Sequence, residues 1–305
     1  MMTTAHATPA HQFRETLNSG RFLLTAELES PRSASAANVR RQAHAFVGLV
    51  DALDCTDNSG AIARMHPVAA ALIASAWGAS ETGLSTLIQL TCRDRNRIAL
   101  QSEILGAAAA GVAGVVCITG DPPDTGNHPD AMGVYDLTSV ELIAAVTGMR
   151  AGRFMSGDSL DPPIDLVVGC VENPAGAENS IARLAAKADA GAEFVQTQII
   201  FDVDVFARWM ALLRSAGLHE RIRVLAGIAP LRRLSIVRRL SSRAPGVLLP
   251  QAVLQRLERA ADAETEGVAI AAETLRAVRQ IAGVAGAHLL TFGWAEGVRR
   301  VLEAE

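Results

Sequence analysis

Two carboxylates, Glu27 and Glu29, stand at the end of the first strand-like run of the chain. Because residues i and i+2 of a strand share a face, Thr25, Glu27 and Glu29 point together. A carboxyl group directed into an apolar interior keeps its proton to higher pH, which suits a general acid. The alternative is a structural ion pair with an arginine such as Arg32 or Arg93. Position alone does not separate the two interpretations.

A second acidic residue, Asp121, follows another apolar run inside the sequence Thr-Gly-Asp-Pro-Pro. Gly120 allows a ligand to approach the backbone closely, and the two prolines stiffen the turn. An Asp at this place can also simply cap its own turn. The connection from Thr119 to Asp130 is long for a barrel loop, and long loops tend to carry function, which favours a functional Asp121.

Two glutamines, Gln196 and Gln198, share one face at the end of a later run. A glutamine amide offers two donors and an acceptor, which suits an amide-bearing heterocycle such as a pterin or a flavin ring. A buried glutamine with satisfied hydrogen bonds is equally compatible with the pattern. Trp294 opens the last helix-like segment as either a packing or a stacking surface, and His288 is expected to be a packed core residue.

These polar residues belong to a repeating pattern of strand-like run, polar tip and helix-like segment. The pattern recurs about eight times, as in a (β/α)8 barrel, where the carboxyl ends of the strands build the active site. We therefore predict an α/β protein: a single TIM barrel over residues 20–305, preceded by a disordered or loosely ordered tail, 1–19. Strands are expected at about 22–27, 50–55, 86–91, 114–118, 164–170, 193–198, 222–227 and 287–291. Helices include one at about 231–242 and two extra ones before the last strand, at about 251–261 and 263–282.

The bulk properties exclude several classes of protein. With 28 basic and 32 acidic residues and a net charge of -4, the chain has no basic surplus for nucleic acid. Its longest nearly apolar stretch, Ile104 to Ile118, is short for a membrane span, and the polar N-terminus does not resemble a signal peptide. The four cysteines lack zinc-site spacing and are expected to be buried in a reducing cytosol. We expect a cytoplasmic protein without a metal site, a possible homo-oligomer, that acts on a small molecule.

Several short motifs occur in order at the predicted strand ends. They are Glu27-x-x-x-Pro31, Asp57-Asn58-Ser59-Gly60, Leu90 to Asn96, Thr119 to Pro123, and Asp189 to Ala192 leading to Thr197-Gln198. Together they resemble the methylenetetrahydrofolate reductase family over about residues 20 to 300. The resemblance implies a flavin-dependent barrel that reduces 5,10-methylenetetrahydrofolate to 5-methyltetrahydrofolate, with NADH or NADPH as electron donor and FAD as bound cofactor.

The resemblance also implies roles for individual residues. Glu27 falls on the family's general acid and Gln198 on a folate-binding glutamine. Asp121 falls on the acidic residue near the flavin pyrimidine edge and the bound pterin, where its charge tunes the flavin. The implied cofactor-binding residues are Thr56, Gln89, Thr119, Gly120, Asp121, Tyr135, Asn173 and Lys187, and the implied substrate-binding residues are Glu27, Asp121, Gln198 and Trp294.

The chain also departs from the family pattern. Gln89 replaces a histidine, Thr119 an arginine, Leu234 a folate-stacking aromatic residue and Trp294 an arginine. These departures keep a second reductase open, in which NADH passes hydride directly to the folate without flavin. A third possibility is a folate- or flavin-binding protein without turnover. The inward acid and Asp121 argue against it, because a binding protein needs no general acid.

Overall fold

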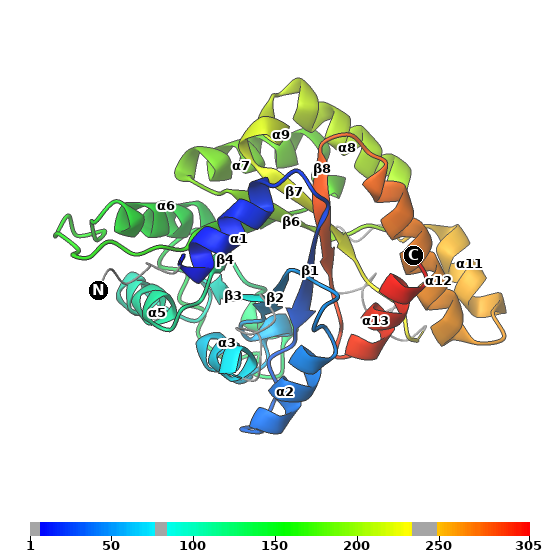
Figure 1. Cartoon of the computed structure of the whole chain (residues 1–305), viewed down its shortest axis with the longest axis horizontal. Coiled ribbons are helices and arrows are strands. Elements are labelled where there is room, and N and C mark those ends of the chain that lie inside the picture. Colours follow the sequence, from blue (N-terminus) through cyan, green and yellow to red (C-terminus); the bar gives the residue numbers. More distant parts are fainter. Residues whose placement is uncertain (1–6, 77–83, 234–248) are drawn as a thin grey trace, which may run out of the picture.

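The computed structural model describes residues 7–76, 84–233 and 249–305. In this part of the chain, parallel strands close into a barrel in chain order, each paired with the next and the last with the first (Figure 1). The strands are β1 Leu23–Leu28, β2 Ala52–Cys55, β3 Ser85–Thr91, β4 Gly114–Ile118, β5 Val167–Glu172, β6 Phe194–Ile199, β7 Arg223–Ile228 and β8 Val284–Leu289. Each overlaps a predicted strand, and the predicted (β/α)8 fold is confirmed.

Helices surround the barrel (Figure 1). They are α2 Ala36–His44, α3 Pro67–Ala74, α5 Arg97–Ala109, α6 Ser139–Arg150, α7 Ala177–Ala190, α8 Val203–Ser215, α9 Leu218–Arg221, α11 Gln251–Arg259, α12 Ala263–Arg279 and α13 Ala295–Glu303. Helix α12 packs on β7, β8, α8 and α13, so it takes the ring position before β8, while α11 packs on α12. The extra helices predicted before the last strand are therefore present. The helix predicted at 231–242 falls mostly on residues 234–248, outside the described residues.

The N-terminal segment corrects the sequence analysis. Residues Pro9–Asn18, predicted to belong to a loosely ordered tail, form helix α1, capped by the Thr8 hydroxyl, which accepts a hydrogen bond from the His11 amide. Phe13 and Leu17 are buried against the amino ends of the strands, and the Phe13 ring meets the Phe194 ring edge-on at 5.9 Å. The apolar positions are too few to stand out in a polar segment. Burying one Phe side chain nevertheless contributes about 2–3 kcal/mol, enough to order a short helix.

The barrel interior changes character along its axis. Near its amino end it is apolar: Leu23, Ala52, Leu87 and Phe194 belong to one buried cluster, with Phe13 from α1. Positions two or four residues further along a strand face the same way. In β1, β2, β3 and β6 those positions are occupied by Glu27, Asp54, Gln89 and Gln196, respectively. The sequence therefore places an apolar cluster, called here the apolar plug, at the amino ends of the strands. A polar layer follows it toward the carboxyl ends.

A second, larger core lies between the strands and the surrounding helices. All four cysteines, Cys55, Cys92, Cys117 and Cys170, are unpaired and buried in it, as the sequence predicts. None of the described helices is long and apolar enough to cross a membrane.

Candidate active site

The polar layer inside the barrel is organised around Asp54. One oxygen of its fully buried carboxylate, Oδ2, accepts hydrogen bonds from Gln89 Nε2 at 3.1 Å and Gln196 Nε2 at 3.0 Å. The register of β1 and β2 pairs Asp54 directly with Glu27. Burial raises the pKa of Asp54 to about 6, although the two amide hydrogen bonds act in the opposite direction.

Glu27 lies beside this layer and is partly exposed. Its Oε2 accepts a hydrogen bond from the Thr291 amide at 3.2 Å. Burial, followed by the negative charge of Glu29, raises the pKa of Glu27 to about 7. Within the described residues Glu27 forms no ion pair, so the arginine partners considered from the sequence do not appear. Arg64 instead pairs with Glu29 at 2.6 Å.

The next layer down is neutral. Thr25 and His288 are both buried, and the Thr25 hydroxyl lies 2.9 Å from His288 Nδ1. Burial lowers the pKa of His288 to about 3, so the ring is uncharged near neutral pH. His288 is therefore the packed core residue that the sequence predicts, and it offers Glu27 no positive charge.

A cavity of about 320 Å³ opens at the carboxyl ends of the strands β2 to β5. Its volume lies at the lower end of the range for small-molecule sites. The turns after β2, β3 and β4 supply most of its lining. It brings together five of the residues that the sequence analysis assigns to a cofactor: Gln89, Thr119, Gly120, Asp121 and Lys187.

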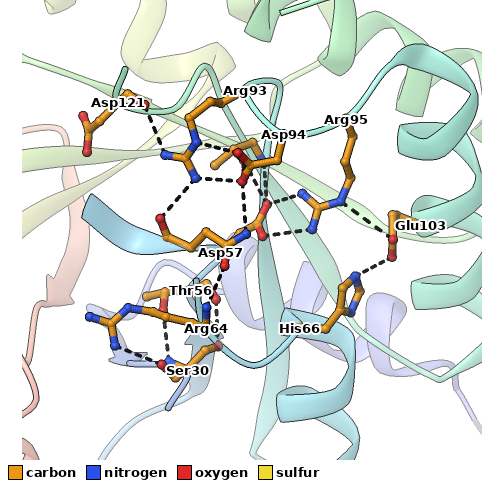
Figure 2. A network of polar contacts seen from close by, with 12 residues as sticks. Ser30, Thr56, Asp57, Arg64, His66, Arg93, Asp94, Arg95, Glu103 and Asp121 are labelled. Atoms are coloured by element: carbon orange, nitrogen blue, oxygen red, sulfur yellow. Dashed lines mark hydrogen bonds and ion pairs between the residues drawn. The ribbon is translucent and has the colours of Figure 1, made fainter. Parts of the chain in front are cut away.

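Arg93 fixes the turns that line this cavity (Figure 2). Its guanidinium, almost completely buried, donates to both oxygens of Asp94 at 2.6 and 2.7 Å. It also donates to the carbonyls of Asn58 and Asp121, each at 3.1 Å. A single planar cation thus ties the turns after β2, β3 and β4 to one another, and such charge-assisted bonds are strong and directional.

A second ion pair supports the same cavity wall (Figure 2). The buried carboxylate of Asp57 accepts from Arg95 at 2.7 and 3.0 Å and from the Thr91 amide at 2.8 Å. Arg95 also lies 3.7 Å from Glu103 on α5. Because Asp57 is saturated by these partners, we assign it to the scaffold of the site.

Asp121 presents its carboxylate away from Arg93, while its carbonyl receives the Arg93 hydrogen bond (Figure 2). The side chain is exposed, and among the described residues it has no hydrogen-bond or ion-pair partner. The preceding Gly120 has φ +89°, and a Cβ there would lie 3.0 Å from Arg93 Cβ. Glycine therefore lets the chain turn tightly over Arg93, and the turn leaves an unpaired carboxylate at the cavity.

Lys187 is buried, with 8% of its surface exposed. Its Nζ donates to the Val171 carbonyl at 2.7 Å and to Glu172 Oε2 at 2.8 Å. Burial by itself would raise the pKa of Glu172, but the hydrogen bond from Arg183 and the charge of Lys187 hold it below its ordinary value. The lysine therefore lines the cavity, but its charge is already matched by a carboxylate.

Two further predicted cofactor residues have local partners. The Thr56 side chain is fully buried, and its hydroxyl accepts from the Ser30 amide at 3.0 Å, which ties the end of β2 to the end of β1. Asn173 accepts from the Ala175 amide at 3.0 Å and lines a different, very small cavity. Neither residue lines the cavity that holds Asp121.

The remaining predicted residues surround the barrel mouth. Tyr135 has an unusual positive φ of 44° and donates its hydroxyl to the Asp121 carbonyl at 3.4 Å. Gln198 Oε1 accepts from the Ile199 amide at 3.0 Å. The guanidinium groups of Arg232 and Arg300 lie 5.4 and 5.9 Å from the ring centre of Trp294, which lines a separate cavity of about 620 Å³.

Sequence reasoning missed the role of Asp54 and the partner of Lys187. The sequence analysis assigns no role to Asp54, yet it is the inner carboxylate that Gln89 and Gln196 share. A carboxylate on the inward face of a short apolar strand was the available signal. Within the described ranges, no group of three or more His, Cys, Asp or Glu is placed to hold a metal ion.

The fold and the site together define a class of protein: a (β/α)8 barrel with a proton-holding carboxyl group and a small-molecule cavity at the carboxyl ends of its strands. Comparison with known proteins identifies the family within this class. The sequence profile described as methylenetetrahydrofolate reductase matches residues 12–305. The chain belongs to the methylenetetrahydrofolate reductase family.

Several curated proteins are similar to this chain. Methylenetetrahydrofolate reductase 2 of Saccharomyces cerevisiae is 28% identical over 59% of this chain and 28% of its own length. The 5,10-methylenetetrahydrofolate reductase of Pectobacterium carotovorum is 27% identical over 57% of this chain and 51% of its own. The matched part of the chain thus spans about a quarter to a half of the length of these relatives.

Solved structures share the fold at lower identity. An uncharacterized protein from Clostridium thermocellum, described as binding two copies of 5-methyl-5,6,7,8-tetrahydrofolic acid, superposes with a TM-score of 0.66 at 11% identity. The superposition covers 96% of this chain and all of the other. A 2,3-dimethylmalate lyase of the PEP mutase/isocitrate lyase superfamily superposes with a TM-score of 0.55 at 15% identity. Both likenesses concern the barrel fold.

Proposed function

We propose that this protein reduces 5,10-methylenetetrahydrofolate to 5-methyltetrahydrofolate with electrons from NADH or NADPH, through bound FAD. The observation that carries the proposal is Glu27. It is an inward carboxyl group with a pKa raised to about 7, at the position of the family's general acid. An acid works best when its pKa lies near the working pH, because it is then both protonated and able to give up the proton.

Glu27 performs the proton step of this proposal. It gives its proton to N10 of the bound folate, which breaks the bond between N10 and the methylene bridge. The carbon left on N5 is then electrophilic and accepts a hydride, which makes it a methyl group. The hydrogen bond from the Thr291 amide holds one oxygen of Glu27, and the barrel wall excludes water from most of the side chain.

The cavity of Asp121 suits the ring system of a flavin. The tight turn at Gly120 brings the backbone close to a planar ligand, and Thr119 and Gln89 offer polar groups along the wall. Gln89 commits one amide hydrogen to Asp54, so its carbonyl oxygen is free to accept from a ring N–H. When bound, FAD would supply the hydride for the methylene carbon.

One observation favours the flavin-free alternative, in which NADH gives its hydride directly to the folate. The cations that line this cavity within the described residues, Arg93 and Lys187, are both committed to carboxylates, Asp94 and Glu172. A diphosphate lying against this wall would have to compete with those ion pairs. The flavin-free reaction does not require an FAD diphosphate at this place.

The two reductases are separated by a visible absorption spectrum of the freshly purified protein, followed by a folate-reduction assay with and without added FAD. A flavin spectrum that survives gel filtration, together with FAD-dependent activity, supports the first reaction. Full activity of colourless protein supports the direct transfer. A protein that binds folate and reduces it under neither condition overturns both and leaves a binding protein.

A further inference from the structure

Two carboxyl groups occupy neighbouring inward positions of the barrel wall. The β1–β2 register pairs Glu27 with Asp54. Neighbouring strands lie about 4.8 Å apart, so paired inward residues stand side by side on the barrel wall. The same interior face carries Leu23 and Ala52 in the apolar plug below, which fixes the direction of both side chains.

The hydrogen bonds of Asp54 are unevenly distributed. Oδ2 accepts both glutamine amides, whereas Oδ1 is buried and has no hydrogen-bond partner among the described residues. An ionised carboxylate is an acceptor at both oxygens, and an unsatisfied buried oxygen of this kind is costly. A proton placed between Oδ1 and the neighbouring carboxyl group would satisfy it.

The charges around the pair do not neutralise it. On β1, Glu29 pairs with Arg64 at 2.6 Å, yet its negative charge still raises the pKa of Glu27 more than the charge of Asp54 does. On β8, His288 is neutral. The strands β3 and β6 present the uncharged amides of Gln89 and Gln196. Within the described residues Asp54 forms no ion pair, and its negative charge adds to that of Glu29 in raising the pKa of Glu27.

We propose that Asp54 and Glu27 form a carboxyl pair that shares one proton inside the barrel, and that Asp54 is a positioning residue that helps to keep Glu27 in its acid form. The pair follows the general behaviour of adjacent carboxyl groups, in which one charge opposes the formation of the second. The charge of Asp54 is one of the causes that raise the pKa of Glu27, after burial and the charge of Glu29.

The pair has a consequence for turnover, which rests on Glu27 being the acid of the proposed reaction. When Glu27 gives up its proton, two negative charges are left side by side. Their repulsion favours uptake of a proton from solvent, and Glu27, the partly exposed member, is where that proton enters. Asp54, fully buried, stays in place and holds the two glutamine amides.

The direct test needs neither folate nor flavin. The side-chain carboxyl carbons of Glu and Asp are labelled with ¹³C, and their shifts are followed against pH, with Glu27→Gln and Asp54→Asn assigning the two signals. In the unsubstituted protein a shared proton makes the chemical shifts of both carboxyl carbons change in the same two pH ranges. The higher of these ranges should lie near the pKa of about 7 of Glu27. Two signals that each move once, in separate pH ranges, would overturn the proposal without reliance on any variant.

The variant test asks whether Asp54 sets the proton affinity of Glu27. Asp54→Asn removes the charge and keeps the shape, so the titration of Glu27 should move to lower pH by about one unit. The matched control is Asp57→Asn, which removes a carboxylate three residues further on that is neutralised by Arg95; it should leave the Glu27 titration in place. An unmoved Glu27 signal in well-folded Asp54→Asn protein, judged by circular dichroism, refutes the pairing.

Kinetics separate this inference from the proposed function. If the protein reduces folate, the high-pH limb of the rate should move to lower pH in Asp54→Asn, whereas a purely structural Asp54 would lower the rate equally at every pH. If the protein does not reduce folate, the proposed function fails. The ¹³C titration still decides the pairing in that case.

Discussion

Replacing Glu27 by Gln removes the proton that the proposed reaction needs, and the size of the loss follows from its surroundings. A carboxyl group with a pKa of about 7 is half protonated at pH 7. With the ordinary value of 4.5 it would be protonated in only about one molecule in 300. The barrel environment therefore raises the protonated fraction of Glu27 at neutral pH about 150-fold. Glu27→Gln should lower folate reduction about 10²–10⁴-fold.

The assay measures folate reduction and, separately, oxidation of NAD(P)H by a small artificial electron acceptor. The second activity should survive in Glu27→Gln, because it needs no proton at N10. The matched control is Glu29→Gln, which changes the carboxylate on the same face that pairs with Arg64 and leaves the Glu27 carboxyl group in place; it should lose much less folate reduction. Equal loss of both activities in Glu27→Gln would make Glu27 structural, and loss in Glu29→Gln alone would transfer the role to Glu29.

The pH dependence of stability gives an independent test of the same environment. The pKa of Glu27 is raised on folding, so between about 4.5 and about 7 the folded state holds a proton that the unfolded state has lost. Glu27 therefore makes unfolding easier as pH rises through this window. Glu27→Gln should raise the melting temperature relative to the parent protein above pH 7 and make little difference below 4.5. The same change in melting temperature at both pH values would refute a buried, proton-holding Glu27.

Three other outcomes are expected. Lys187→Ala should lower the flavin bound per chain after gel filtration and also the melting temperature, because Glu172 loses a buried partner. The double variant Lys187→Met with Glu172→Gln should recover the melting temperature but not the bound flavin. Unchanged flavin in both variants would remove Lys187 from the site. Asp121→Asn should raise the flavin midpoint potential in a redox titration, since an unpaired negative charge is lost; a lowered melting temperature with an unmoved potential would mark a turn cap. Phe13→Ala should lower the free energy of unfolding, measured in urea, by about 3–5 kcal/mol, because it leaves a cavity in the apolar cluster at the amino end of the barrel. A loss below about 1 kcal/mol would mean that α1 is not part of the folded core.

The sequence by itself determined the barrel, because its evidence is local. Most of the strands are short apolar runs that end in a polar residue, and helix-like segments follow them, so the order of elements can be read without knowing any distance. The same local signals located Glu27 at the end of β1 and the turn of Gly120 and Asp121 after β4. Helix α1 was not predicted, since its few apolar residues are recognisable as core residues only once they are seen packed against the amino ends of the strands.

Tertiary structure decided which polar residues face one another. Gln196 reaches Asp54 across 142 positions of sequence, and Glu27 becomes a neighbour of Asp54 only through the register of two strands. Lys187 could be read from sequence as solvated or as a ligand contact, and its partner Glu172 follows from the packing of α7 on β5. Local patterns fix the direction of a side chain along its own strand. The proton affinity of a carboxyl group depends on burial and on charges that other strands bring to it, and only the closed barrel sets those.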